Sequence, residues 1–443
     1  MRGPIRFPPA AAWTALYVCL SMTGLCAADG SGALAAAFGT LALLALAATF
    51  RGPADSAFSI ALSVLALTLP FGAPSVNAIN EALVALGLIR VLYGKRRGPV
   101  LRAGGAETAL LAYFAVGVLC AAFGVSFADS LGRLKSELHL LFAFFLFAAA
   151  FAEAPAPGPL RLFALGFAAA ACYGISQPIT FYYTHTGVMM ARALVHHISF
   201  GEMLALALCG GLAAWEFPSA LGAPSAVKPR ALAFCLLLWV ALILSQARGP
   251  WLAFGAAFLT LAALRKELRT LLTAAAASVV VLMAVPPFYQ RFASIFDPAQ
   301  HANAVRFELW KLAWRMFLDH PVFGVGPANF GTLFHVYYPG KLGEADVWTQ
   351  VHNLYLHQLA ERGLVGFAML LVLFGVLTGR AWRTYRRRPD FWSLWRLGAM
   401  AALWVMNFTQ NSFHTASVWM LLVFLWAWCE RNCAGAGREA AHD

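Results

Sequence analysis

Long apolar runs recur along the whole chain, and they constrain its fold more than any other feature of the sequence. Each run holds about 20 residues, the length at which an α-helix crosses the hydrocarbon core of a bilayer. Hydrophobic residues make up 61% of the 443 residues and charged residues only 12%, which is too little polar surface for a soluble protein of this size. The sequence therefore predicts an all-α polytopic membrane protein, since a helix satisfies its own backbone hydrogen bonds within lipid.

The runs predict twelve to fourteen membrane spans. The lower number applies when the short pair at 56–70 and 78–93, which proline and glycine interrupt, does not cross the bilayer. Residues 1–29 place Arg2 and Arg6 ahead of an apolar run, and we interpret them as an uncleaved first span rather than a signal peptide. The predicted spans are 10–28, 32–50, 56–70, 78–93, 107–127, 136–153, 160–183, 197–215, 230–246, 250–265, 269–286, 363–380, 392–409 and 415–429.

The basic residues predict the direction of the spans, because lysine and arginine collect in cytoplasmic loops. With the N-terminus inside, strict alternation places four basic clusters in the cytoplasm: Lys95-Arg96-Arg97, Lys228 with Arg230, Arg265 with Lys266 and Arg269, and Arg383 with Arg386, Arg387 and Arg388. These loops account for most of the net charge of +12, so nucleic acid is not an expected partner. The same alternation places the loop 184–197, the turn 246–250 and the segment 287–362 outside.

The segment 287–362 is the longest stretch without a predicted span, and it divides the chain. We predict a transmembrane bundle over 1–286, an outer segment over 287–362, C-terminal spans over 363–430 and a cytoplasmic tail over 431–443. Within the outer segment, apolar residues at 309, 310, 313, 314, 317 and 318 recur at helical spacing. They predict a short amphipathic helix with a Trp-rich face that is suited to lying at the membrane interface.

Among the arginines predicted on the outer side, against the trend of the basic residues, three are candidates for a functional role: Arg192, Arg248 and Arg306. Each is at or near a predicted membrane boundary, where a cation is costly unless it is paired or solvated. Few acidic residues are available outside to neutralise them, and guanidinium groups bind phosphate oxygens through two parallel hydrogen bonds. We therefore expect an anionic ligand. The alternative is that these side chains anchor the protein to lipid headgroups.

His352 stands where polar residues run directly into a predicted span. His352, Leu356 and Leu359 have helical spacing, which predicts a histidine held on a short helix just outside the bilayer. A metal is not expected, because the histidines and acidic residues form no HExxH or Asp-x-Asp pattern. The eight cysteines lie mostly inside apolar runs without CxxC spacing, as expected of core residues.

Three motifs between Ser245 and Gly366 resemble those of the O-antigen ligase and O-antigen polymerase superfamily. The first is similar to its S-x-S-R-G signature, with Ala247 in place of the second serine. Order, spacing and membrane placement agree over residues 234–380, whereas the N-terminal third matches only as generic spans. The motifs are Ser245-Gln246-Ala247-Arg248-Gly249; Arg306, Trp310, His320-Pro321, Gly324-Val325-Gly326 and Asn329-Phe330; and His352-Asn353-x-Tyr355-Leu356 with Glu361-x-Gly363-Leu364-x-Gly366.

The resemblance implies a GT-C-type glycosyltransferase of the bacterial inner membrane, which acts without a metal or other cofactor. Such a ligase moves O-antigen from undecaprenyl pyrophosphate to a sugar hydroxyl of lipid A–core and inverts the anomeric carbon. The segment 287–362 would then be a periplasmic catalytic segment. His352 would be the general base, since an imidazole titrates near neutral pH, and the three outer arginines would bind the pyrophosphate. Second-tier candidates, the first two for orienting sugar or base, are Asn353, Tyr355 and Glu361.

Other functions are compatible with parts of this pattern. The single long outer segment favours a ligase over an O-antigen polymerase. Another ligase of lipid-linked glycans is a further alternative. A transporter of lipid-linked saccharides would also have many spans and buried arginines, but transporters usually show repeated halves and charges at the middle of the membrane. We find no internal repeat, and the polar groups gather on one side. A structural membrane scaffold would leave the outer arginines unexplained.

Overall fold

The computed structural model describes residues 65–71, 105–151, 157–185, 189–284, 286–343 and 345–439. Within these ranges the chain is built from helices, and it forms no strand. The predicted spans at 10–28, 32–50 and 78–93, and most of the span at 56–70, lie outside the described residues. The predicted all-α polytopic architecture is confirmed for the part of the chain that is described.

Five of the described helices are long and apolar enough to cross a membrane: α5 (Gly105–Ala122), α7 (Pro157–Thr184), α8 (His197–Glu216), α9 (Pro224–Leu244) and α16 (Leu354–Arg387). Three shorter apolar stretches form α10 (Arg248–Leu264), α17 (Phe391–Met406) and much of α18 (Ala416–Glu439). The bundle also contains α6 (Phe127–Phe151) and α11 (Lys266–Met283). The chain is therefore a multi-pass membrane protein.

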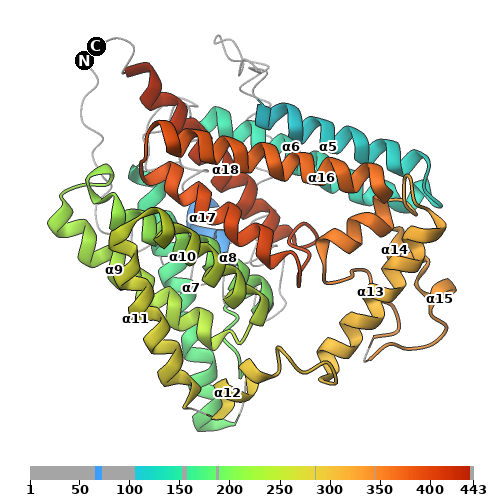
Figure 1. Cartoon of the computed structure of the whole chain (residues 1–443), viewed down its shortest axis with the longest axis horizontal. Coiled ribbons are helices and arrows are strands. Elements are labelled where there is room, and N and C mark those ends of the chain that lie inside the picture. Colours follow the sequence, from blue (N-terminus) through green and yellow to red (C-terminus); the bar gives the residue numbers. More distant parts are fainter. Residues whose placement is uncertain are drawn as a thin grey trace, which may run out of the picture.

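Helix α8 lies at the centre of the bundle (Figure 1). Its apolar stretch is 83% buried, against 33% or less in the other four spanning helices. It packs against α9, α10 and α17, and Trp395 of α17 donates its indole N–H to the Leu206 carbonyl at 2.9 Å. Because a buried indole N–H needs a partner, this hydrogen bond fixes how α17 lies on α8. On another side of the bundle, α5 lies between α6 and α16 (Figure 1).

The segment after α11 folds into one long and three short helices at one end of the bundle: α12 (Pro286–Ala293), α13 (His301–Asp319), α14 (Asn329–Thr332) and α15 (Phe334–Tyr337). This segment has a small core of its own, which includes Leu309, Leu312, Ala313, Met316, Val325, Phe330, Phe334, Val351 and Ala360. In Figure 1, α13, α14 and α15 lie together on the right, beside the start of α16.

The amphipathic helix predicted over 306–318 is present as α13, but much of its apolar face is not at a membrane interface. Leu309 and Ala313 are fully buried in the small core. Trp314 and Leu318 remain exposed, at 48% and 58%. The prediction that the apolar face lies at the membrane interface was therefore wrong for Leu309 and Ala313. Periodicity identifies an apolar face but does not show what covers it.

Helix α16 changes direction at Gly363. This residue has φ 60° and ψ −160°, a conformation that is essentially restricted to glycine. A Cβ at this position would come within 2.4 Å of the Val322 carbonyl group, and the Leu364 N–H donates to the Pro321 carbonyl at 2.8 Å. Residues 354–362 therefore pack with the long segment before the helix continues as a span. The kink lies where the outer segment 287–362 was predicted to end and the C-terminal spans to begin. That division into segments stays a prediction.

Gly363→Ala is expected to lower the free energy of unfolding by about 1–3 kcal/mol from backbone strain alone, and by more with the clash. The measurement is the midpoint of thermal unfolding of the purified protein in detergent. Gly375→Ala is the matched control on the same helix, because an added Cβ there meets nothing within 4 Å. Alanine favours a helix over glycine, so the control should be neutral or slightly stabilising. Equal midpoints for the two variants would contradict this account of the kink.

Candidate active site

Arg248 is the first residue of α10, after a tight turn that leads out of α9. Gly249 allows this turn to approach the loop between α17 and α18, since a Cβ there would lie 2.4 Å from Thr409 Oγ1. The Arg248 guanidinium donates to the Ser294 carbonyl at 2.6 Å and to the Ser294 hydroxyl at 3.0 Å. It also donates to Gln300 Oε1 at 3.3 Å. Arg248 is therefore buried and held by neutral oxygens, which do not cancel its charge.

Two further arginines act electrostatically on Arg248: Arg291 of α12 and Arg306 of α13. Burial lowers the pKa of Arg291 and of Arg306, and the positive charge of Arg291 lowers the pKa of Arg306 further. Arg291 donates to the Gln246 carbonyl at 3.0 Å. Within the described ranges Arg306 has no hydrogen bond, and none of the three pairs with a carboxylate. Crowded cations of this kind are stabilised when an anion binds among them.

His352 lies close enough to Arg306 for their charges to interact, in the loop that enters α16. It is not on the helix, as its spacing had predicted: its φ is 54°, and the following residue, Asn353, is the N-cap. Burial lowers the pKa of His352 to about 4, the Arg306 charge lowers it as well, and a hydrogen bond with Gln410 acts in the opposite direction. The imidazole is therefore uncharged at neutral pH, which is the form that accepts a proton. Its Nδ1 is buried and has no partner in the described part of the chain.

Arg192, His196 and His197 join this group from the start of α8. The Arg192 charge acts on both histidines, and Arg291 acts on His197. The charge of His196 in turn acts on His352. The ring centroids of His196 and His197 lie 4.4 Å apart. The structure therefore brings together the histidine and the three arginines that were predicted from the sequence, although they come from four separate segments.

Two second-tier candidates, Asn353 and Tyr355, make contacts that hold the local fold. Asn353 caps α16, since its Oδ1 accepts the Leu356 N–H at 3.0 Å. Tyr355 donates its hydroxyl to the Trp404 carbonyl at 2.7 Å, and its ring stacks against Trp404. These contacts account for both side chains without a ligand, and their role in orienting sugar or base stays a prediction.

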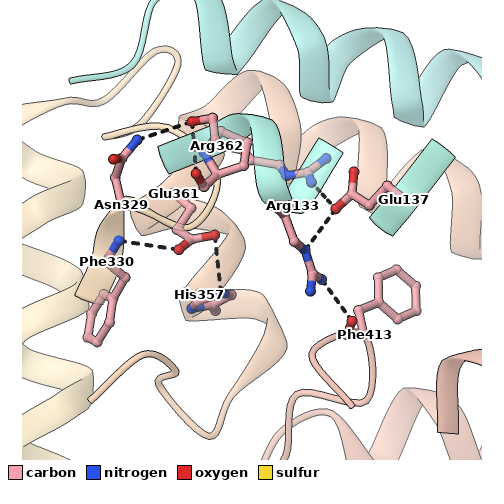
Figure 2. A network of polar contacts seen from close by, with 10 residues as sticks. Arg133, Glu137, Asn329, Phe330, His357, Glu361, Arg362 and Phe413 are labelled. Carbon is pink, nitrogen blue, oxygen red and sulfur yellow. Dashed lines mark hydrogen bonds and ion pairs between the residues drawn. The ribbon is translucent and has the colours of Figure 1, made fainter. Parts of the chain in front are cut away.

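Glu361, the third second-tier candidate, belongs to a buried polar network on the first part of α16, as Figure 2 shows. One carboxylate oxygen accepts the Phe330 backbone N–H at 3.3 Å, and the other lies 3.2 Å from His357 Nε2. Both His357 and Glu361 are buried. The Glu361 side chain therefore ties α14 to α16, and a direct role in chemistry stays a prediction.

The same network continues through Arg362, which pairs with Glu137 of α6 (Figure 2). Glu137 also accepts from Arg133 Nε at 3.1 Å, and Arg133 donates to the Phe413 carbonyl at 2.7 Å. Removing one partner of a buried ion pair typically costs about 3–5 kcal/mol, so these contacts hold α6, α16 and the loop 407–414 together. That loop carries Gln410, the hydrogen-bond partner of His352.

Arg291 and Gln410 belong to the site but were not predicted from the sequence. Arg291 is a further arginine of the outer segment, the placement that had already singled out Arg306. Gln410 lies in a polar run between two apolar stretches, Thr409 to Ser412, and it is 5% exposed. A polar run of this kind at the end of a span could have marked Gln410 as a candidate site residue. That Gln410 lies near His352 follows only from the tertiary fold.

The donors at this site indicate which chemistry it supports. Among the described residues, no group of three or more histidine, cysteine or acidic side chains could hold a metal ion. The site instead combines several guanidinium groups, which bind anions, with an uncharged imidazole that can accept a proton. This combination suits attack by a hydroxyl group on a substrate that carries a phosphate leaving group.

Part of the chain is similar to a known protein family. Residues 233–371 match the family model described as O-antigen ligase. The matched range contains Arg248, Arg291, Arg306 and His352. No match was found among the curated proteins compared with the chain. Residues 233–371, and with them most of the site described above, are therefore similar to the O-antigen ligase family.

Proposed function

We propose that the protein is a membrane glycosyltransferase of the O-antigen ligase type. Its donor would be O-antigen polysaccharide on undecaprenyl pyrophosphate, and its acceptor a sugar hydroxyl of lipid A–core oligosaccharide. The observation that carries the proposal is an uncharged His352 beside arginines that have no carboxylate partner in the described ranges. Transfer from a sugar pyrophosphate to a hydroxyl requires a base beside a site for the departing anion.

In the proposed reaction the acceptor hydroxyl oxygen attacks C1 of the donor sugar while the bond from C1 to the pyrophosphate breaks. The hydroxyl proton passes to His352, and the electron pair of the broken bond leaves with the pyrophosphate. Arg248 and Arg306, assisted by Arg192 and by the neighbouring Arg291, stabilise the charge that develops there. Fixed charges of this kind act more strongly in a partly dry site than in water. A single displacement inverts the anomeric carbon, and no step requires a metal.

The site is proposed to face the periplasm from the bacterial inner membrane. The cluster Arg383 to Arg388 follows the last long span of the matched region, and such clusters mark the cytoplasmic side. The segment 287–343 carries no comparable basic cluster and lies at the opposite end of α16. This orientation allows both lipid-linked substrates to reach the site from the outer leaflet.

Thiol labelling tests the orientation. In a background that lacks the eight natural cysteines, Ala299→Cys should react with an impermeant thiol reagent added to intact spheroplasts, whereas Arg387→Cys should react only after the membrane is permeabilised. Both positions are exposed, and neither side chain contributes to the proposed site. The reverse labelling pattern would place the site in the cytoplasm.

The activity itself is tested with purified protein and both lipid substrates, without nucleotide or added metal. A glycosidic product between donor glycan and acceptor core is the expected result. Growth of the donor glycan when no acceptor is present would identify a polymerase instead. Movement of intact donor across a vesicle membrane without any new bond would identify a transporter.

A further inference from the structure

A groove of about 800 Å³ runs along α13, outside the site described above. Its walls include three aromatic residues at helical spacing, Phe307, Trp310 and Trp314. Phe307 and Trp314 are 42% and 48% exposed. We propose that this groove binds an oligosaccharide, namely sugar residues of a substrate beyond the one that reacts. The inference rests on the proposed function, because it assigns a place to part of a glycan substrate.

The aromatic residues supply the apolar part of a saccharide site. A sugar ring has one face of C–H groups and a rim of hydroxyls, so an exposed indole suits the face while polar neighbours suit the rim. Phe307 and Trp310 meet edge to face, with ring centroids 5.3 Å apart, which holds Trp310 in place. The Trp310 indole N–H is buried and has no partner within the described ranges, whereas Trp348 donates its own N–H to the Leu342 carbonyl at 2.8 Å.

The polar residues of the groove suit hydroxyl groups better than phosphate. Glu308 and Lys311 form an ion pair at 2.7 Å, and both are substantially exposed. Each is therefore available to hydroxyls, and together they add no net charge. A phosphate would find no uncompensated cation here, in contrast to the arginine site. The carboxylate of Glu308 also makes this wall a poor surface for acyl chains.

Two residues of the groove are close in the chain to residues of the proposed active site. Leu356 lines the groove, and its backbone N–H is bound by Asn353, the residue directly after His352. On the other wall, Trp310 lies one helical turn after Arg306. A glycan whose reacting end lies between His352 and Arg306 can therefore continue along α13.

The test uses two soluble probes: core oligosaccharide freed of lipid A, and O-polysaccharide freed of its polyprenyl carrier. Binding to the full-length protein in nanodiscs is measured by calorimetry. Trp314→Ala should weaken binding of one probe by about tenfold and raise KM for the corresponding substrate with little change in kcat. Trp310→Phe, which keeps an aromatic ring beside Phe307 but reduces the aromatic surface of the groove, should weaken the same probe severalfold.

Trp382→Ala is the matched control. Trp382 is an exposed tryptophan, 42% accessible, near the far end of α16, and its loss should leave binding unchanged. An effect on the core probe alone identifies the acceptor glycan as the occupant, and an effect on the polysaccharide alone identifies the donor glycan. Both results support the groove. Because binding needs no turnover, probe binding without transfer would refute the proposed function and retain the saccharide site.

Three results would overturn the proposal. The first is unchanged binding of both probes in Trp314→Ala and Trp310→Phe. The second is no binding of either probe by the wild-type protein. The third is quenching of Trp314 by brominated acyl chains, measured as the difference between wild type and Trp314→Phe, which would place this face of α13 in the membrane.

Discussion

His352→Ala is expected to reduce glycan transfer by about 10²–10⁴-fold, the usual contribution of a general base. The residue belongs to neither hydrophobic core, so the variant should insert and fold normally. Transfer is measured with purified protein and both lipid substrates, and ligation in a strain without the native enzyme. His335→Ala is the control, since His335 is exposed on α15 and should be dispensable. Transfer at the wild-type level by His352→Ala would remove the base from the mechanism.

The pH dependence of the same reaction follows from the environment of His352. In the free protein burial and Arg306 lower its pKa to about 4, so the imidazole is uncharged above that pH and becomes protonated, and inactive as a base, below it. The bound pyrophosphate brings negative charge beside Arg306, which favours the imidazolium and raises the pKa of His352. The acidic limb of kcat/KM should therefore lie near pH 4, and the acidic limb of kcat at higher pH. A limb of kcat at lower pH than that of kcat/KM would contradict this coupling.

Periodicity and charge identify most of the described helices because the membrane restricts a chain so strongly. An apolar run of sufficient length has few alternatives to a helix in lipid, and α8 follows such a run closely. Residues whose surroundings come from other segments were harder to predict. The burial of Leu309 depends on Phe330 and Val351, which approach it only after the long segment has folded.

The same distinction holds at the proposed site. Arg248, Arg306 and His352 were recognisable because each lies in a motif with characteristic neighbours. The sequence spacing placed His352 on a helix, and its imidazole side chain was expected to titrate near neutral pH. The structure instead places His352 before the N-cap with a depressed pKa. Burial and the nearby Arg306 cause that difference, and both arise from the tertiary fold. Gln410 was missed for the same reason, because it lies 58 positions after its partner His352 in the sequence.

Arg306→Lys is expected to reduce transfer by about 10²–10³-fold without lowering the thermal midpoint. Arg306 makes no hydrogen bond or ion pair among the described residues, so its replacement breaks no contact of the fold. Lysine keeps the charge but loses the planar pair of donors that matches phosphate oxygens. Arg248→Lys should reduce both transfer and stability, because the guanidinium also holds Ser294 and Gln300.

Arg315→Lys provides the matched control for these variants. Arg315 is exposed on α13, the helix that carries Arg306, and its replacement should leave transfer unchanged. EDTA should have no effect on the wild-type protein, because the arginines and not a divalent cation would stabilise the departing pyrophosphate. Full activity of both Arg306→Lys and Arg248→Lys, or inhibition by EDTA that Mg²⁺ reverses, would show instead that the arginines anchor the protein to headgroups while a metal stabilises the leaving group.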